Sequence, residues 1–216
     1  MTLQFPNESR DYRAAREALL QAEIDLRSQI EKVAAKRRAL PMGGVIPTDY
    51  AFRCLDGTRQ PISTLFGDHD TLAIYSLMYG PKATGPCPMC SAFLDGMTGQ
   101  ISHIAKRMAV AVIAESSPKR LSSLCDQMAW QTLPLLSADG TSYQTDYLAQ
   151  SPDGDQLPML NVFVRNGDEI RHFWGSEMFY APSDWHPRHI DALWPLWNLL
   201  DLTPSGRGDH MPSLSA

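Results

Sequence analysis

The sequence is poor in cysteine and lacks any long apolar run without charges. Four cysteines among 216 residues are too few for the disulfide framework of a small secreted domain, and a chain of this length can bury a core without one. No uncharged apolar run reaches the ~20 residues that a membrane-spanning helix needs. The first residues, MTLQFPNESRDYRAAREALL, lack the apolar stretch and cleavage site of a signal peptide. We therefore expect a cytoplasmic protein that keeps its thiols reduced and does not bind membranes.

An excess of positive charge is also missing. The chain has 19 lysines and arginines against 24 aspartates and glutamates, a net charge of −5 that is spread along the sequence. This distribution predicts no binding to nucleic acid or to an anionic membrane. A hydrophobic content of 44% with 20% charged residues is typical of a soluble globular protein.

Residues 8–40 carry a pattern that predicts one long helix. Apolar side chains recur every seven residues with charged residues between them, and Pro41 ends the pattern. The repeat consists of Leu19, Leu26, Val33 and Leu40. Such a stripe can lie on the chain's own domain or pair with a second copy, and so short a repeat does not distinguish the two. A homodimer joined through this helix is one of the two hypotheses.

The rest of the sequence predicts an α/β domain with a mixed sheet. Buried strands alternate with amphipathic helices in the first half, which requires parallel βαβ units. In the second half, Asn166-Gly167 separates two strand-like runs and predicts an antiparallel hairpin. We expect strands at residues 50–54, 71–79, 109–114, 133–137, 159–164 and 169–174, and helices at residues 61–66, 88–108, 118–128 and 190–202.

These elements divide the chain into three expected segments. Residues 1–45 form an N-terminal helical arm, residues 46–205 form the α/β domain, and residues 206–216 form a disordered tail. Gly96 and Gly99 lie inside the helix expected at 88–108, where each costs about 1 kcal/mol relative to alanine.

Two cysteines lie close together in the stretch ATGPCPMCSAFLDG, residues 83–96. Pro86 keeps a helix from beginning earlier, because the residue before a proline avoids the α region. Pro88 suits the first helical position, where its missing N–H is not needed. Cys87 then falls at the N-cap, with free N–H groups and the positive end of the helix dipole near its sulfur. Cys90 lies about one turn further on.

This position favours a thiolate at Cys87. Helix N-termini and CxxC motifs lower a cysteine pKa from about 8.5 into the range ~3.5–7.5. A thiolate attacks a disulfide or a peroxide and leaves a mixed disulfide or a sulfenic acid, which Cys90 would resolve to a Cys87–Cys90 disulfide. The sequence therefore predicts a redox pair.

A zinc half-site is the main alternative for a CxxC pair. It needs two further ligands, typically a second close pair, whereas the remaining cysteines are single and far apart. Cys54 and Cys125 are expected to be small buried side chains. Of the histidines, His186 and His189 alone are closely spaced. We expect neither a metal nor a cofactor.

Three stretches carry a resemblance to a known family: YSLMYGPKATGPCPMCSAFLDG, LPMLNVFVRNGDEIRHFWG and LLDLTPSGRG. They resemble an uncharacterised, mostly bacterial family with a thioredoxin-like fold and a CPxCS motif, a domain of unknown function, over about residues 8–208. The resemblance implies a thioredoxin-like fold, with Leu157-Pro158 as that fold's cis-proline loop beside the cysteines. Thioredoxins have Trp-Cys-Gly-Pro-Cys, and this chain departs from that pattern at Pro86 and at the Pro-Met between the cysteines.

A partial resemblance to peroxiredoxins is also present. Their motif places a proline, a threonine or serine, and the peroxidatic cysteine in order, and Pro81, Thr84 and Cys87 follow it one residue short. The segment LPLLSADGTSY also resembles peroxiredoxins. Three functions remain open: a thiol–disulfide oxidoreductase, a thiol peroxidase with Cys87 as the peroxidatic cysteine, and a binding protein without activity. The residues expected to contact a substrate are Thr84, Pro86, Leu157 and Pro158.

Overall fold

The computed structural model describes residues 4–181 and 190–214. The chain divides into two compact units, Met1–Pro41 and Met42–Ala216. Among the described residues, no helix is both long and apolar enough to span a bilayer. The division into an arm of residues 1–45, an α/β domain of residues 46–205 and a tail of residues 206–216 stays a prediction.

The first unit consists mainly of helix α1, Arg10–Arg38. Ser9 caps it, because the Ser9 side chain accepts a hydrogen bond from the backbone N–H of Tyr12. Three basic residues in its last turn suit the negative end of the helix dipole. No residue of α1 is buried, and the side chains of Leu19 and Leu26 are 47% and 61% exposed. The long helix predicted from the heptad pattern is confirmed.

Seven strands of the described residues form one sheet in the order β2-β1-β5-β4-β3-β6-β7. Strands β3, β4 and β5 run parallel, β6 pairs antiparallel with β3, and β7 pairs antiparallel with β6. The expected α/β fold, with a parallel half and an antiparallel hairpin half, is therefore confirmed. The strands are β1 Ala51–Arg53, β2 Arg59–Pro61, β3 Thr71–Ser76, β4 Ala109–Ala114, β5 Leu135–Ser137, β6 Met159–Asn166 and β7 Glu169–Gly175.

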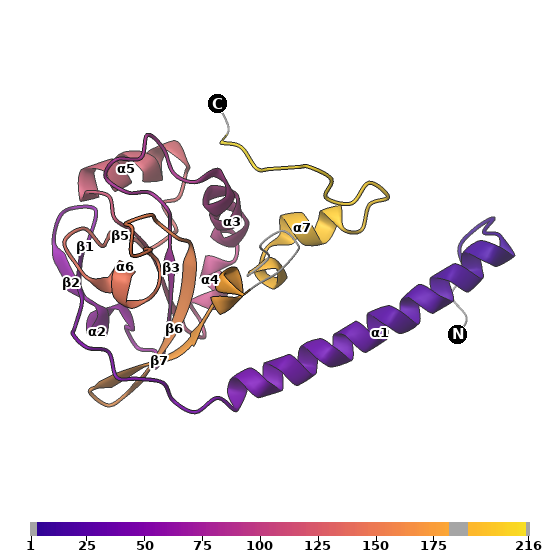
Figure 1. Cartoon of the computed structure of the whole chain (residues 1–216), viewed down its shortest axis with the longest axis horizontal. Coiled ribbons are helices and arrows are strands. Elements are labelled where there is room, and N and C mark those ends of the chain that lie inside the picture. The colour runs from indigo at the N-terminus through magenta and orange to yellow at the C-terminus, as the bar shows by residue number, and fades with distance from the viewer. Residues whose placement is uncertain (1–3, 182–189, 215–216) are drawn as a thin grey trace. The chain divides into compact units, whose positions relative to one another are not determined.

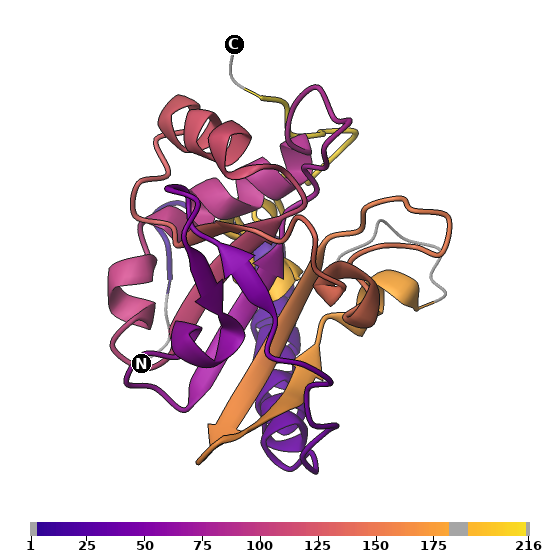
Figure 2. The ribbon, with the colours of Figure 1, turned by 90° about the vertical axis from the view of Figure 1, so that its left-hand side faces the viewer.

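Helices cover both faces of the sheet (Figures 1 and 2). One apolar cluster joins the sheet to α3, α5 and α7, and a second joins its other face to α2 and α6. Because side chains alternate along a strand, Tyr75 of β3 belongs to the first cluster and Ile74 to the second. The helices are α2 Ile62–Leu65, α3 Pro88–Thr98, α4 Ile101–Ile104, α5 Pro118–Gln127, α6 Tyr143–Asp146 and α7 Pro195–Leu200, with short 3-10 turns at Glu177–Tyr180 and Asp191–Leu193.

The helix expected at residues 88–108 is interrupted at Gly99, whereas Gly96 lies within an unbroken helix. Helix α3 ends at Thr98, and Gly99 separates it from the single turn of α4. A Cβ atom at Gly96 would lie 3.4 Å from Cδ of Pro195, an ordinary van der Waals contact between α3 and α7. Strand β2 and helix α6 were not predicted, because three or four residues are too few to show a period.

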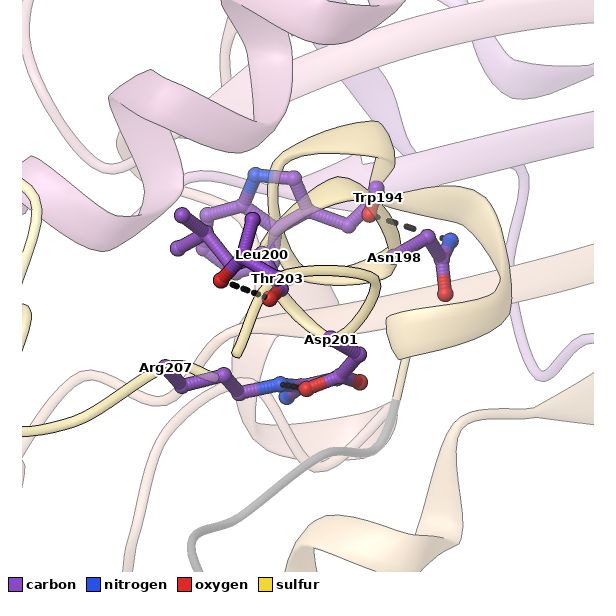
Figure 3. Close-up of polar contacts among 6 residues, drawn as sticks. All are labelled: Trp194, Asn198, Leu200, Asp201, Thr203 and Arg207. Atoms are coloured by element: carbon purple, nitrogen blue, oxygen red, sulfur yellow. Dashed lines mark hydrogen bonds and ion pairs between the residues drawn. The ribbon is translucent and has the colours of Figure 1, made fainter. Parts of the chain in front are cut away.

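The C-terminal segment is anchored on α7 (Figure 3). Asp201 accepts two hydrogen bonds from the Arg207 guanidinium at 2.6 and 2.7 Å, and this guanidinium lies 5.2 Å from the ring centre of Trp197. Trp197 contacts Trp194, which in turn contacts Phe93 of α3. The stretch LLDLTPSGRG thus joins the end of the chain to the helix that carries the cysteines.

Candidate functional site

Cys87 lies where the chain leaves the end of strand β3 and enters helix α3. Cys87 is the N-cap of α3, with extended backbone angles of −61° and 124°, and Pro88 follows in the first turn. The Cys87 N–H donates to the Met78 carbonyl at 3.0 Å, and its carbonyl accepts from the Ser91 N–H at 2.9 Å. The N-cap position that Pro86 and Pro88 predict for Cys87 is therefore confirmed. The Cys87 side chain is half-buried, whereas Cys90 is 2% exposed.

The pKa values of the two thiols are shifted in opposite directions. A hydrogen bond from the Cys90 thiol lowers the pKa of Cys87 to about 6, against the opposing effect of burial, and the backbone N–H groups of Cys90 and Met89 lower it further. The same contact, together with burial and the Cys87 charge, raises the pKa of Cys90 well above its usual range. Near neutral pH the pair therefore holds one proton, on Cys90, and a nucleophilic thiolate at Cys87. Both thiols are free in this structure.

Tyr75 is the third member of this group. It points from β3 toward α3, is 4% exposed, and its ring centre lies 4.9 Å from that of Phe93. Its hydroxyl forms a side-chain hydrogen bond with Cys90, which favours the thiolate form of Cys90. Burial is the main reason that the pKa of Tyr75 is raised, so the phenol stays protonated and can donate.

The loop before Cys87 is held by helix α5. Arg120 donates to the carbonyl oxygens of Gly80 at 2.9 Å and Pro81 at 2.7 Å, and also to that of Ala83. Its guanidinium stacks 4.5 Å from the ring centre of Tyr79. One planar side chain thus donates to three backbone carbonyls of the turn, of which that of Gly80 also accepts from the Ala83 N–H at 3.2 Å.

The loop that contains Leu157 and Pro158 is fastened to the same turn. Gln156 donates to the Glu115 carboxylate at 3.0 Å, and a Cβ atom at Gly80 would stand only 2.8 Å from Nε2 of Gln156. Since Ser76 pairs with Met159 at the end of the β3–β6 ladder, Pro158 lies just beyond the strand end from which the cysteine loop leaves.

The predicted cis bond before Pro158 is wrong, because the described residues contain no cis peptide bond. Trans is the usual form even before proline. The loop is shaped instead by hydrogen bonds: the Leu157 N–H donates to the Ala149 carbonyl at 2.9 Å, and Gln150 pairs with Gln156. That N–H is consequently not available to a substrate chain.

The other predicted substrate contacts lie within the cysteine loop. Pro86 is buried beside Cys87, and Thr84 is exposed three residues before it. Within the part of the chain that the structure describes, no hydrogen bond joins the Thr84 hydroxyl to either thiol. Arg120, which reaches this loop from α5, donates its N–H groups to backbone carbonyls.

Comparison with protein families decides the affiliation of the chain. Residues 1–215 match the family described as bacterial proteins of unknown function (DUF899). The chain belongs to this family. A comparison with curated proteins gives no match.

Solved structures that the chain resembles include a thioredoxin and several peroxiredoxins. An exposed lipoprotein thioredoxin of Streptococcus pneumoniae is 14% identical, with 68% of this chain and 98% of that chain covered and a TM-score of 0.43. A peroxidoxin of Mycobacterium tuberculosis is 16% identical, with 72% and 95% covered and a TM-score of 0.46. Peroxiredoxin Q of Xanthomonas campestris is 16% identical, with 71% and 94% covered and a TM-score of 0.47. These superpositions are loose, and the thioredoxin-like fold of this family member rests on the strand order and directions given above.

Cys54 and Cys125 lie apart from the site. Cys125 is buried on α5, and the Cys54 thiol donates to Gln60 at 3.1 Å. The described residues contain no group of three or more histidines, cysteines or acidic residues that could hold a metal ion. His186 and His189, the histidine pair weighed for a zinc site, lie outside the described residues.

Sequence reasoning missed Tyr75, Arg120 and Gln156. Tyr75 lies in an apolar strand, where its ring suggests core packing alone. Because side chains alternate along a strand, Tyr75 shares a face of the sheet with Leu77, and α3 covers that face. This alternation was the only feature of the sequence that could have indicated its place near the cysteines. Arg120 and Gln156 are far from Cys87 in the sequence, and nothing local marks them.

Proposed function

We propose that this protein is a thiol–disulfide oxidoreductase with Cys87 as the nucleophile and Cys90 as the resolving thiol. The observation that carries the proposal is the unequal pair: a half-buried Cys87 at a helix N-cap with its pKa lowered to about 6, beside a buried Cys90 whose pKa is raised. A structural pair of thiols in an apolar core needs no such difference.

The reaction proceeds in two exchanges. The Cys87 thiolate attacks one sulfur of a substrate disulfide, which forms a Cys87–substrate disulfide and expels one substrate thiolate. Cys90 then loses its proton to solvent, attacks the Cys87 sulfur, and expels the second substrate thiolate. The substrate disulfide is reduced by two electrons, and two equivalents of an external thiol reduce the Cys87–Cys90 disulfide again and leave as their own disulfide.

Thr84, Pro86, Leu157 and Pro158 are the proposed substrate contacts. Thr84 is exposed on the cysteine loop, and the Leu157 carbonyl is the backbone group of its loop that a substrate chain can pair with, since its N–H is occupied. The proposed substrate is a protein or a small molecule that carries a disulfide. We further propose a cytoplasmic location, where external thiols would keep the pair reduced.

Disulfide exchange is favoured over peroxide reduction by the surroundings of Cys87. A peroxidase needs a hydroxyl and a cation near its thiolate, but Thr84 makes no hydrogen bond to Cys87 among the described residues, and the N–H groups of Arg120 serve the loop. Stopped-flow reaction with hydrogen peroxide at about 10⁵ M⁻¹s⁻¹ or faster would favour the peroxidase instead.

Reaction of the reduced protein with the aromatic disulfide DTNB tests the proposal. The oxidoreductase releases two equivalents of thionitrobenzoate from this pair in two phases, a fast one from Cys87 and a slower one from Cys90. Uniformly slow release from all thiols at neutral pH would instead identify a binding protein with unreactive cysteines.

We also propose that the protein is a homodimer joined through α1. The heptad side chains Leu19 and Leu26 are about half-exposed or more within the chain, and a second copy of the same helix would bury them.

A further inference from the structure

A cavity of about 350 Å³ lies on the opposite face of the sheet from the cysteines. Asn161 lines it, and Asn161 pairs with Ile74 of β3, whereas the neighbouring residue Tyr75 faces Cys90. This volume is room for a small organic molecule. The redox pair makes no use of this cavity.

The imidazole of His172 is fixed at this cavity by contacts on several sides. Its Nε2 lies 2.9 Å from Oδ1 of the buried Asn161, whose Nδ2 donates to the Tyr147 carbonyl at 3.2 Å. The ring stacks on Tyr147 with 5.6 Å between ring centres. A Cβ atom at Gly175 would lie 3.0 Å from Oδ1 of Asn161 and 3.5 Å from Nε2 of His172, so the glycine leaves the space that this contact occupies.

This arrangement determines which His172 nitrogen carries the proton. The Asn161 amide donates to Tyr147, so its oxygen faces His172 and Nε2 must donate. Burial lowers the pKa of His172, with Glu177 acting in the opposite sense, so the ring is neutral at pH 7. Nδ1 is then a hydrogen-bond acceptor, and it has no partner among the described residues.

The two carboxylates at the cavity, Asp146 and Glu177, are acceptors as well. Glu177 is exposed and forms no ion pair with any described residue. One oxygen of Asp146 accepts from Tyr50 at 2.7 Å and Ser142 at 2.6 Å, which leaves its second oxygen open. No lysine or arginine stands among the described residues that line the cavity. Its polar groups therefore match a ligand that is rich in donors and positively charged.

The rim of the cavity is apolar. Val45 and Leu148 are 49% and 51% exposed, and Tyr147 and Met159 form further apolar wall. Leu148 closes helix α6 with a φ of 57°, a left-handed conformation that glycine usually takes at this position. The chain thus holds a leucine in an unfavourable backbone conformation and presents its side chain at the cavity.

We propose that this cavity binds a small primary amine with an apolar or aromatic body. The ammonium group, which has three donors and no acceptor, lies among Asp146, Glu177 and Nδ1 of His172, and the body lies against Tyr147 and Leu148. An aromatic wall beside the carboxylates adds a favourable contact with the cation. The site is separate from the redox pair and does not depend on the activity proposed for it.

Titration of the full-length protein with tyramine, followed by backbone amide NMR shifts, tests this proposal. 4-Ethylphenol, which has a similar shape but lacks the ammonium group, is the matched neutral probe. We expect tyramine to cause saturable shifts at Tyr147, Leu148 and His172, and 4-ethylphenol to bind much more weakly.

Two variants locate the charge and the apolar wall. Glu177→Gln should raise the dissociation constant for tyramine about two- to fivefold, the effect of one exposed ion pair. Asp168→Asn, the same charge change at an exposed residue of the β6–β7 turn, should leave it unchanged. Leu148→Gly suits the left-handed backbone and should preserve the fold while it weakens binding about threefold or more.

The proposal is overturned if tyramine causes no saturable shifts up to about 10 mM, a weak affinity of little more than 2.7 kcal/mol. It is equally overturned if 4-ethylphenol binds as tightly as tyramine, if the shifts cluster away from Tyr147 and His172, or if Glu177→Gln and Asp168→Asn behave alike.

Discussion

Arg120 in helix α5 donates a hydrogen bond of 2.7 Å to the carbonyl oxygen of Pro81. The same guanidinium reaches the carbonyls of Gly80 and Ala83, so a helix distant in sequence sets the path of the loop that ends at Cys87. The acidity of Cys87 depends on backbone N–H groups and on Cys90 standing at fixed positions.

Replacing each cysteine separately should show which one attacks. We expect Cys90→Ser to accumulate a mixed disulfide with a disulfide substrate, because Cys87 still attacks and nothing resolves the product. Cys87→Ser should give none, because Cys90 is buried and protonated. Mass spectrometry of the intact protein measures both. A mixed disulfide in Cys87→Ser alone would reverse the assignment.

The alkylation of Cys87 should follow a pKa of about 6. Its rate with iodoacetamide should be constant above about pH 7 and fall tenfold per pH unit below about pH 5, because only the thiolate reacts. The Cys90 thiol is the largest cause of the lowered pKa. Cys90→Ala should therefore move the midpoint upward, and Cys90→Ser, which keeps a donor, should move it less. An unchanged midpoint in Cys90→Ala would contradict this cause.

Tyr75→Phe should slow the second exchange and leave the first unchanged. The Tyr75 hydroxyl favours the Cys90 thiolate, the form that must attack. Loss of a hydrogen bond to a charged group, about 1.5 kcal/mol, corresponds to a slowing of roughly tenfold. Stopped-flow release of thionitrobenzoate separates the two phases. Tyr79→Phe, in the loop three residues beyond the end of β3, is the control, and an equal effect in both variants would refute a specific role for Tyr75.

Arg120→Met should loosen the cysteine loop. Three carbonyls lose a charged donor, so we expect the free energy of unfolding to fall by about 1–3 kcal/mol and amide exchange at residues 80–86 to become faster. Denaturant titration and hydrogen exchange measure these changes. Lys119→Met removes an exposed positive charge from the neighbouring position and serves as the control. Normal exchange at residues 80–86 in Arg120→Met would show that the clamp is not needed.

A charge in the α1 stripe should dissociate the proposed dimer. Leu26 is 61% exposed within the chain and lies at the centre of the heptad pattern. Leu26→Glu should therefore convert a dimer to a monomer, while Glu23→Lys on the same helix should not. Light scattering at micromolar concentration gives the mass. If the unaltered protein is already a monomer, the dimer proposal fails.

Much of the fold could be predicted because it depends on short-range chemistry. Pro88 lacks an N–H and fits the first turn of a helix, so Cys87 had to be the N-cap, as it is. Apolar runs and the Asn166-Gly167 turn specified β3, β4 and the β6–β7 hairpin close to their observed bounds. Local rules worked less well for β2, for α6 and for the break at Gly99, where elements are too short to show a period.

The site required the tertiary structure. The unequal acidities of Cys87 and Cys90 depend on how deeply each thiol is buried and on Tyr75, which the sheet places against α3. The resemblance to thioredoxins suggested a cis bond at Pro158, but hydrogen bonds from Leu157 and Gln156 shape that loop with a trans bond. Residue types and spacing determine which thiol can sit at a helix end. Burial and contacts between distant segments decide its charge, because the burial of Cys90 and its hydrogen bonds to Cys87 and Tyr75 form only when the chain has packed.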